Sequence, residues 1–137
     1  MKTKRMILFG LVLLFLGTAL VFSQSFTNSG RWSVVGYQVN GVNAAYDFYD
    51  YITFANEANG NRTFTVYFRD GRGPSYHHLT NRTGSGANNS YDVRITQSNG
   101  AVGTGTARTY TPPSGDATYE YTIVGHNTVT LTLRPRN

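Results

Sequence analysis

Between residues 31 and 134 the chain repeatedly alternates apolar and polar side chains, and no other feature constrains its fold as strongly. Val129, Leu131 and Leu133, for example, alternate with threonines and an arginine. Segments 64–69, 91–95 and 119–123 show the same alternation. Successive side chains of an extended strand point to opposite faces, so this pattern is typical of strands with one buried face and one solvated face. The sequence therefore predicts an all-β protein.

Short turn signals separate the expected strands. Asn59-Gly60 and Asn99-Gly100 accept the positive φ angles of a tight hairpin turn, and Gly125-His126-Asn127 is expected to close a third hairpin. Neighbouring strands joined by short turns imply a single antiparallel meander. We expect seven strands, and an eighth if residues 73–79 are extended, at 31–39, 51–55, 63–69, 91–97, 102–110, 119–124 and 128–134.

Glycine and proline mark the expected irregular segments. Residues 84–89 are expected to be the most flexible part of the domain, and residues 111–115, with paired prolines, form a second loop. Gly103 and Gly105 interrupt one expected strand, where they indicate a bulge or a sharp bend. A meander of this length must protect its edge strands, and closure into a barrel removes them. We therefore expect a barrel, with an antiparallel β-sandwich as the alternative.

The N-terminal segment has the three parts of a secretory signal peptide. Cations at residues 2–5 precede an apolar run at 6–22, and Ser23 is a small residue at its end. We expect cleavage after Ser23, which leaves one all-β domain at residues 24–137. An uncleaved anchor is the alternative, because the apolar run is nearly long enough to span a bilayer.

The composition of the chain that remains after cleavage predicts its compartment and its partners. The chain has no cysteine, which favours a bacterial protein, periplasmic or extracellular, that is not integral to the membrane. Three of its twelve cations lie in the signal, so nine arginines and seven acidic residues remain, spread along the domain. Nucleic-acid binding needs a concentrated basic patch. Nucleic acid is therefore not an expected partner.

A Gly-x-Trp motif opens the first expected strand, at Gly30-Arg31-Trp32. This motif at the head of a meander resembles the lipocalin and lipocalin-like families of small β-barrels. The resemblance implies that Trp32 closes one end of the barrel and that a basic residue on a late strand packs across it. Arg134 is the candidate for that residue, since a guanidinium can stack on an indole face.

Three other kinds of barrel share parts of this pattern. Avidin-like barrels build their pocket with several tryptophans, whereas Trp32 is the only tryptophan here. Small periplasmic domains of the META type also begin with Gly-x-Trp, but their Gly-Cys-Asn-type segment is missing. Outer-membrane barrels need strands of roughly nine to eleven residues, whereas several of the alternating runs here are shorter. They also usually end on an aromatic residue, whereas this chain ends in Arg136-Asn137. The lipocalin-like barrel is therefore preferred.

The sequence offers little catalytic or metal-binding chemistry. His77 and His78 are adjacent in an extended segment, so they point to opposite faces and do not easily share one ion; we expect them at the surface. Asp47 and Asp50 are close in the sequence, but paired-carboxylate catalysis needs two acids held across a cleft. We therefore expect no enzyme activity, no bound metal and no cofactor.

Aromatic residues supply the candidate binding site. Tyr46, Phe48, Tyr49 and Tyr51 crowd one stretch, which the lipocalin-like resemblance places near the open mouth of the barrel. Tyrosine gives a pocket an apolar wall with a hydrogen-bonding tip, so we expect a small apolar or amphipathic ligand. The alternative is a solid core, because small barrels can be filled by their own side chains. Such a domain would contact an envelope or host protein through its Tyr- and Arg-rich surface.

Overall fold

Nine strands and one short helix make up the part of the chain that the computed structural model describes, residues 30–136. The expected signal peptide at residues 1–23 lies outside the described residues. The elements are β1 (Arg31–Val39), β2 (Val42–Asn43), β3 (Tyr49–Asn56), the 3-10 helix η1 (Ala58–Gly60), β4 (Arg62–Phe68), β5 (Ser75–Ser85), β6 (Asn88–Thr96), β7 (Val102–Tyr110), β8 (Ala117–Ile123) and β9 (Thr128–Arg136).

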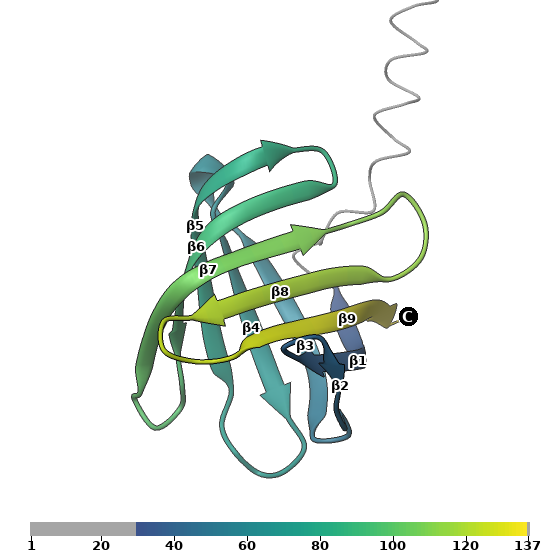
Figure 1. The fold of residues 1–137 in the computed structure, drawn as a ribbon, viewed down its shortest axis with the longest axis vertical. Coiled ribbons are helices and arrows are strands. Elements are labelled where there is room, and N and C mark those ends of the chain that lie inside the picture. Colours follow the sequence, from purple (N-terminus) through teal and green to yellow (C-terminus); the bar gives the residue numbers. More distant parts are fainter. Residues whose placement is uncertain (1–29, 137) are drawn as a thin grey trace, which may run out of the picture.

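The long strands form a closed antiparallel barrel (Figure 1). Each pairs with the next long strand in the chain, and β1 also pairs with β9, which closes the sheet. The closing ladder runs from Arg31 opposite Arg136 to Val39 opposite Val129. β2 is a short additional strand on β1. The predicted meander and barrel are confirmed, the sandwich is excluded, and the architecture is that of a lipocalin-like barrel.

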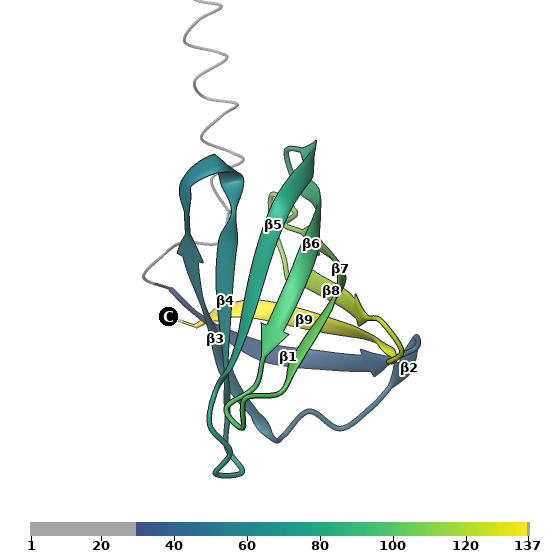
Figure 2. The same cartoon turned by 90° about the vertical axis from the view of Figure 1, so that its left-hand side faces the viewer.

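Strand direction changes strongly around the barrel. β3 and β4 cross β8 and β9 steeply, and a quarter turn of the view shows β1 lying across β5 and β6 (Figures 1 and 2). Register shifts occur between Val34 and Gly36, between Tyr49 and Tyr51, and between Thr80 and Thr83. Such irregularities bend a strand and increase its local twist, which helps a sheet to close.

The two glycines of β7 mark a bend and not a bulge. β7 keeps an unbroken register with β6 past Gly103 and Gly105, while its ribbon curves over its first half (Figure 1). A Cβ atom at Gly105 would lie 1.8 Å from the carbonyl oxygen of Thr122 on β8. The missing side chain therefore lets the two backbones approach at the bend.

The turn predictions are confirmed at three places and wrong at one. Asn59, Gly100 and Gly125 have the positive φ angles expected of the hairpins they close. The expected flexible loop at 84–89 is instead a tight hairpin turn, because β5 runs to Ser85 and β6 begins at Asn88. Its glycines supply the positive φ angles of that turn.

One end of the barrel, where β1 begins and β9 ends, is filled by side chains. Trp32 packs edge to face on Phe54, Phe54 on Phe64, and Phe64 on Tyr119, with ring centroids 5.6, 4.5 and 4.8 Å apart. Leu133 is fully buried beside them. Edge-to-face packing is a favoured arrangement of aromatic rings, so this end of the barrel is a solid core.

Alanine substitutions at two phenylalanines of β4 should distinguish the filled end from the other end. Phe64→Ala is expected to lower the free energy of unfolding by about 3–5 kcal/mol, since Phe64 is fully buried in the solid core. Phe68→Ala should cost clearly less, because Phe68 is only half-buried at the wall of a cavity. Urea unfolding of both variants measures the difference. Equal losses would contradict a barrel filled at one end only.

Candidate functional site

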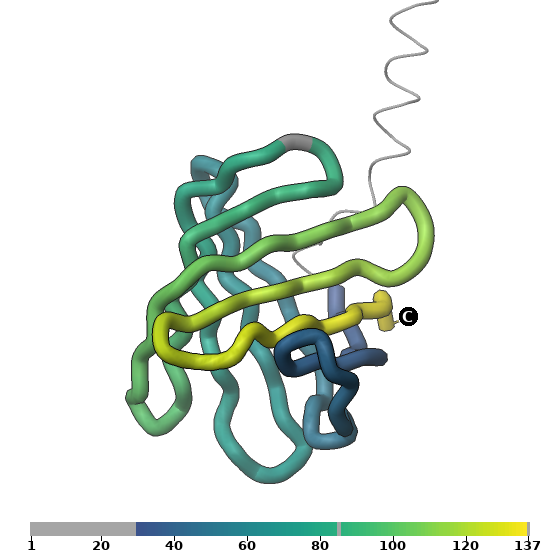
Figure 3. Tube along the Cα trace, in the orientation of Figure 1, coloured from purple at the N-terminus to yellow at the C-terminus, as the bar shows by residue number. Residues whose placement is uncertain are grey.

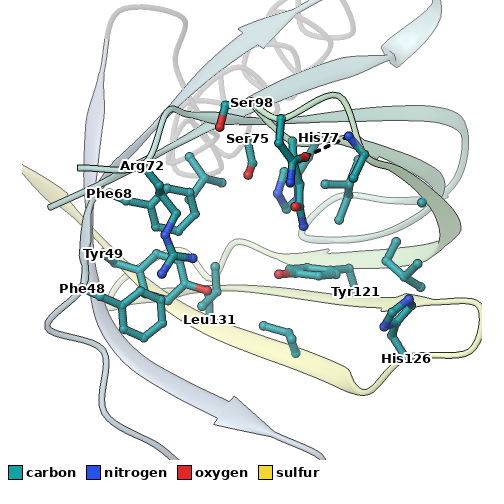
Figure 4. Close-up of a pocket in the computed structure, with 18 of the residues that line it drawn as sticks. Phe48, Tyr49, Phe68, Arg72, Ser75, His77, Ser98, Tyr121, His126 and Leu131 are labelled. Carbon is teal, nitrogen blue, oxygen red and sulfur yellow. Dashed lines mark hydrogen bonds between the residues drawn. The ribbon is translucent and has the colours of Figure 1, made fainter. Parts of the chain in front are cut away.

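The other half of the barrel is hollow. A cavity of about 830 Å³ lies at the end where the loops at 69–74, 97–101 and 124–127 connect the strands (Figure 4). Small-molecule sites in proteins usually have volumes of about 300–1,000 Å³. The space therefore has the size of a small-ligand site.

The cavity wall is mostly apolar, with polar groups at its inner end and at its rim. No acidic side chain of the described residues lines it. The apolar part consists of Val39, Phe48, Val66, Phe68, Ile95, Ala101, Val102, Ile123, Val129 and Leu131. The polar groups come from Tyr37, Tyr49, Ser75, His77 and Tyr121 inside, and from Arg72, Gln97, Ser98, Asn99, His126 and Asn127 nearer the loops.

An arginine stacked on aromatic rings forms one side of the rim (Figure 4). The guanidinium of Arg72 lies 4.6 Å from the ring centroid of Phe68 and 5.5 Å from that of Phe48. Its Nε also donates to the carboxylate of Asp70, at 3.0 and 2.9 Å. These hydrogen bonds lower the pKa of Asp70 and raise the pKa of Arg72. The rim cation is therefore already neutralised by a carboxylate outside the cavity.

The opposite part of the rim is held by one asparagine of the β1–β2 turn, which lies against β9 in Figure 3. The backbone N–H of Asn40 donates to the carbonyl of Thr128 at 2.8 Å, and the N–H of Thr128 donates to Oδ1 of Asn40 at 2.9 Å. Nδ2 of Asn40 also donates to Oδ1 of Asn127 at 3.0 Å. These bonds fix the β8–β9 turn beside the cavity.

The phenols of Tyr49, which is buried, and Tyr121, which is half-buried, lie close together in the interior. Burial raises the pKa of Tyr121 to about 12, and the nearby Tyr37 adds to the shift. Burial, together with Tyr121 and Tyr37, also raises the pKa of Tyr49 far above its usual value. Both phenols therefore stay protonated and neutral, and they offer hydroxyl groups without adding charge to the wall.

A buried histidine forms the inner end of the cavity. His77 is only 3% exposed, and its Nδ1 lies 2.7 Å from the hydroxyl of Tyr119, in the solid core. Its ring also packs edge to face on Tyr121, with centroids 5.0 Å apart. Burial lowers the pKa of His77 from its usual value of 6.5 to about 3. The imidazole is therefore neutral at physiological pH.

The structure brings together two of the four aromatic residues in the predicted site. Phe48 and Tyr49 line the cavity, with ring centroids 4.4 Å apart. Tyr51 instead stacks on Tyr67 on the outer face, because the register shift between Tyr49 and Tyr51 breaks the alternation that would have placed both inside. Tyr46 is exposed and is not part of the lining.

Arg134 does not cover Trp32. Ser33 and Arg134 are direct partners across β1 and β9, so their side chains share the outer face, whereas Trp32 belongs to the core. Nε and Nη2 of Arg134 donate to the carboxylate of Asp116 at 2.9 and 3.0 Å. These hydrogen bonds lower the pKa of Asp116 and raise that of Arg134. The expectation drawn from the lipocalin-like resemblance is therefore wrong for this pair, while Trp32 does lie in the filled end.

An Arg134→Ala variant tests this placement. The Arg134 side chain is 62% exposed, and exposed ion pairs contribute little to stability. We expect the urea midpoint and the emission maximum of Trp32, the only tryptophan in the chain, to be unchanged within error. A destabilised variant with red-shifted tryptophan emission would mean that Arg134 shields Trp32 from water.

Several residues of the cavity were not expected from the sequence, above all His77. The prediction that His77 and His78 point to opposite faces is confirmed, but the expected surface location holds only for His78, which lies 3.9 Å from Glu57. The alternation of Ser75, His77 and Leu79 was the signal for an inward histidine. Arg72, Tyr37 and Tyr121 come from different loops and strands, so only the closed barrel brings them together.

Within residues 30–136, no three His, Cys, Asp or Glu side chains lie close enough together to hold a metal ion. The same residues contain no helix with the length and hydropathy needed to cross a bilayer. Comparisons with protein-family models, with curated proteins and with solved structures find no match to this chain. The fold and the site define the protein as a closed antiparallel β-barrel, solid at one end and hollow at the other.

Proposed function

We propose that this protein is an exported lipocalin-like barrel that binds a small apolar or amphipathic molecule. The cavity carries the proposal: about 830 Å³ with a largely apolar wall and a few inward polar groups. The basic and apolar N-terminal segment supports export, to the periplasm or out of the cell.

The same cavity favours binding over catalysis. A general base that works near neutral pH needs a pKa close to that value, and burial lowers the pKa of His77 to about 3. The described lining residues also include no carboxylate that could act with it. We therefore propose a binding protein and not an enzyme.

A contact with an envelope or host protein is the second candidate function, and one feature of the outer face favours it. Tyr51 stacks on Tyr67, and the guanidinium groups of Arg31 and Arg136 lie 4.5 and 5.2 Å from the Tyr51 ring. Tyrosine and arginine are enriched at the energetic centres of protein interfaces. A carrier that delivers its ligand to a partner would use both features.

Ligand binding can be tested by filling the cavity. Val129→Trp places a large ring in the apolar wall, whereas Val124→Trp makes the same change at a side chain that is 79% exposed. In calorimetric titrations with naphthalene and naphthol, we expect Val129→Trp to weaken binding by at least about tenfold and Val124→Trp to bind like the parent. If the parent binds neither probe, or if both tryptophan variants bind equally well, the cavity is not the site.

A further inference from the structure

The inner end of the cavity presents one ring nitrogen that the described residues leave without a hydrogen-bond partner, that of His77. Nδ1 of His77 is paired with the hydroxyl of Tyr119, which is not part of the cavity lining. Nε2 lies on the other side of the same ring, and residues 30–136 give it no hydrogen bond. Ligand cavities with apolar walls use a few such polar groups to orient the molecule that they bind. A bound molecule that reaches the inner end would supply the missing partner.

The surroundings of His77 favour an uncharged partner. It faces the phenols of Tyr119 and Tyr121 on β8, and its two strand neighbours are apolar, Phe64 on β4 and Ile95 on β6. The described part of the chain places no carboxylate in the lining, and the guanidinium of Arg72 at the rim is already bound to Asp70. An ionised head group would lose its hydration there without gaining an opposite charge.

A hydroxyl group fits Nε2 whichever ring nitrogen carries the proton. When the Tyr119 hydroxyl donates to Nδ1, Nε2 carries the proton and donates; when Nδ1 donates to Tyr119, Nε2 accepts. A hydroxyl both donates and accepts, so it can bind in either case, whereas a carbonyl can only accept.

We infer that the cavity takes an uncharged, mainly apolar molecule that carries a hydroxyl group, and that this hydroxyl binds Nε2 of His77. This inference rests on the proposed function and adds to it the chemistry and the orientation of the ligand. The apolar body lies along Ile123, Val129 and Leu131, and its outer end meets the Phe48 and Phe68 rings beneath Arg72.

Three naphthalene probes of similar shape separate the possibilities in calorimetric titrations of the parent protein. Naphthalene has no polar group, naphthol adds a neutral hydroxyl, and naphthoate adds a charge. We expect naphthol to bind about fivefold to tenfold more tightly than naphthalene, which is the usual worth of one hydrogen bond. Naphthoate should bind more weakly than naphthol, because its carboxylate must be desolvated.

Two variants test whether His77 causes the preference for naphthol over naphthalene. His77→Phe keeps a ring but removes both nitrogens, and it leaves the Tyr119 hydroxyl unpaired. The double variant His77→Phe with Tyr119→Phe removes both partners of that bond. It leaves no buried hydroxyl unpaired, so it is expected to fold even if the single variant does not. Both variants should bind naphthol and naphthalene equally. His78→Phe makes the same change at the neighbouring, exposed histidine outside the cavity and should keep the preference for naphthol.

Each of the other outcomes overturns either the proposed ligand-binding function or the inferred contact between a hydroxyl group and His77. Equal binding of naphthol and naphthalene by the parent, or a preference that survives in the folded double variant, overturns the inference and leaves the proposed function in place. Tightest binding of naphthoate also overturns it and assigns the head-group contact to Arg72. Failure of the parent to bind any of the three probes overturns the proposed function itself.

Discussion

Gly105→Ala is expected to destabilise the barrel by at least about 4 kcal/mol, or to prevent it from folding. A Cβ atom at this position would lie 1.8 Å from the carbonyl oxygen of Thr122, 2.8 Å from its carbonyl carbon and 2.9 Å from Cα of Ile123. All three atoms belong to the backbone of β8, so no side-chain rotation can relieve the clash. The two strands would have to separate at the bend.

Gly103→Ala is the matched control on the same strand and the same face. Its Cβ would lie 2.7 Å from Cγ2 of Ile123, and all its near neighbours are side-chain atoms of Ile123, which borders the cavity. We expect a loss of about 1 kcal/mol, in the ordinary range for a point substitution. Urea unfolding measures both variants. Similar losses for the two would mean that β7 and β8 do not approach at Gly105 as the structure has them.

Acid is expected to destabilise the protein through His77. The folded state holds this imidazole at a pKa of about 3, because its cation would be buried, whereas the unfolded chain binds a proton near pH 6.5. Between these values the unfolded state carries a proton that the folded state lacks. The free energy of unfolding therefore has its full value above pH 6.5. Below that pH it decreases by about 1.4 kcal/mol for each pH unit. From pH 6.5 to 4.5 the loss amounts to about 2 kcal/mol, because the unfolded histidine is only half protonated at pH 6.5.

Two glutamine variants isolate this contribution. His77→Gln removes the titrating group and retains polar atoms for the Tyr119 hydroxyl, so the free energy of unfolding should change far less over that pH range. His78→Gln changes the neighbouring, exposed histidine on the outer face and should retain the parent slope. Urea unfolding at pH 6.5, 5.5 and 4.5 gives the slopes. A parent protein as stable at pH 4.5 as at pH 6.5 would show that His77 takes up its proton without penalty.

Much of the fold was predictable because it depends on local patterns. The alternation at Val129, Leu131 and Leu133 determines which face of β9 is buried, and positive φ angles at Asn59, Gly100 and Gly125 reverse the chain. Such signals act over a few residues. The tight turn between β5 and β6 was mistaken for a loop, because several glycines and asparagines in one stretch do not reveal which of them form the turn.

The candidate site was only half predictable, and the register shift in β3 is the main reason. Sequence alternation places Tyr49 and Tyr51 on one face, whereas the irregularity at Asp50 sends Tyr51 outward and keeps Tyr49 inside. The prediction that Arg134 packs on Trp32 was wrong for a related reason. The face on which Arg134 lies depends on which β1 residue it opposes. The sequence also did not show which end of the barrel is hollow, since aromatic rings fill one end and only border the cavity at the other.

A crystal structure of residues 24–137 grown with naphthol tests most directly whether the barrel binds a ligand in its cavity. We expect density for the probe inside the barrel, between the Phe48 and Phe68 rings and His77, with its hydroxyl within hydrogen-bond distance of Nε2. An interior closed by its own side chains, with the probe absent or bound only on the outer face, would contradict a ligand-binding barrel.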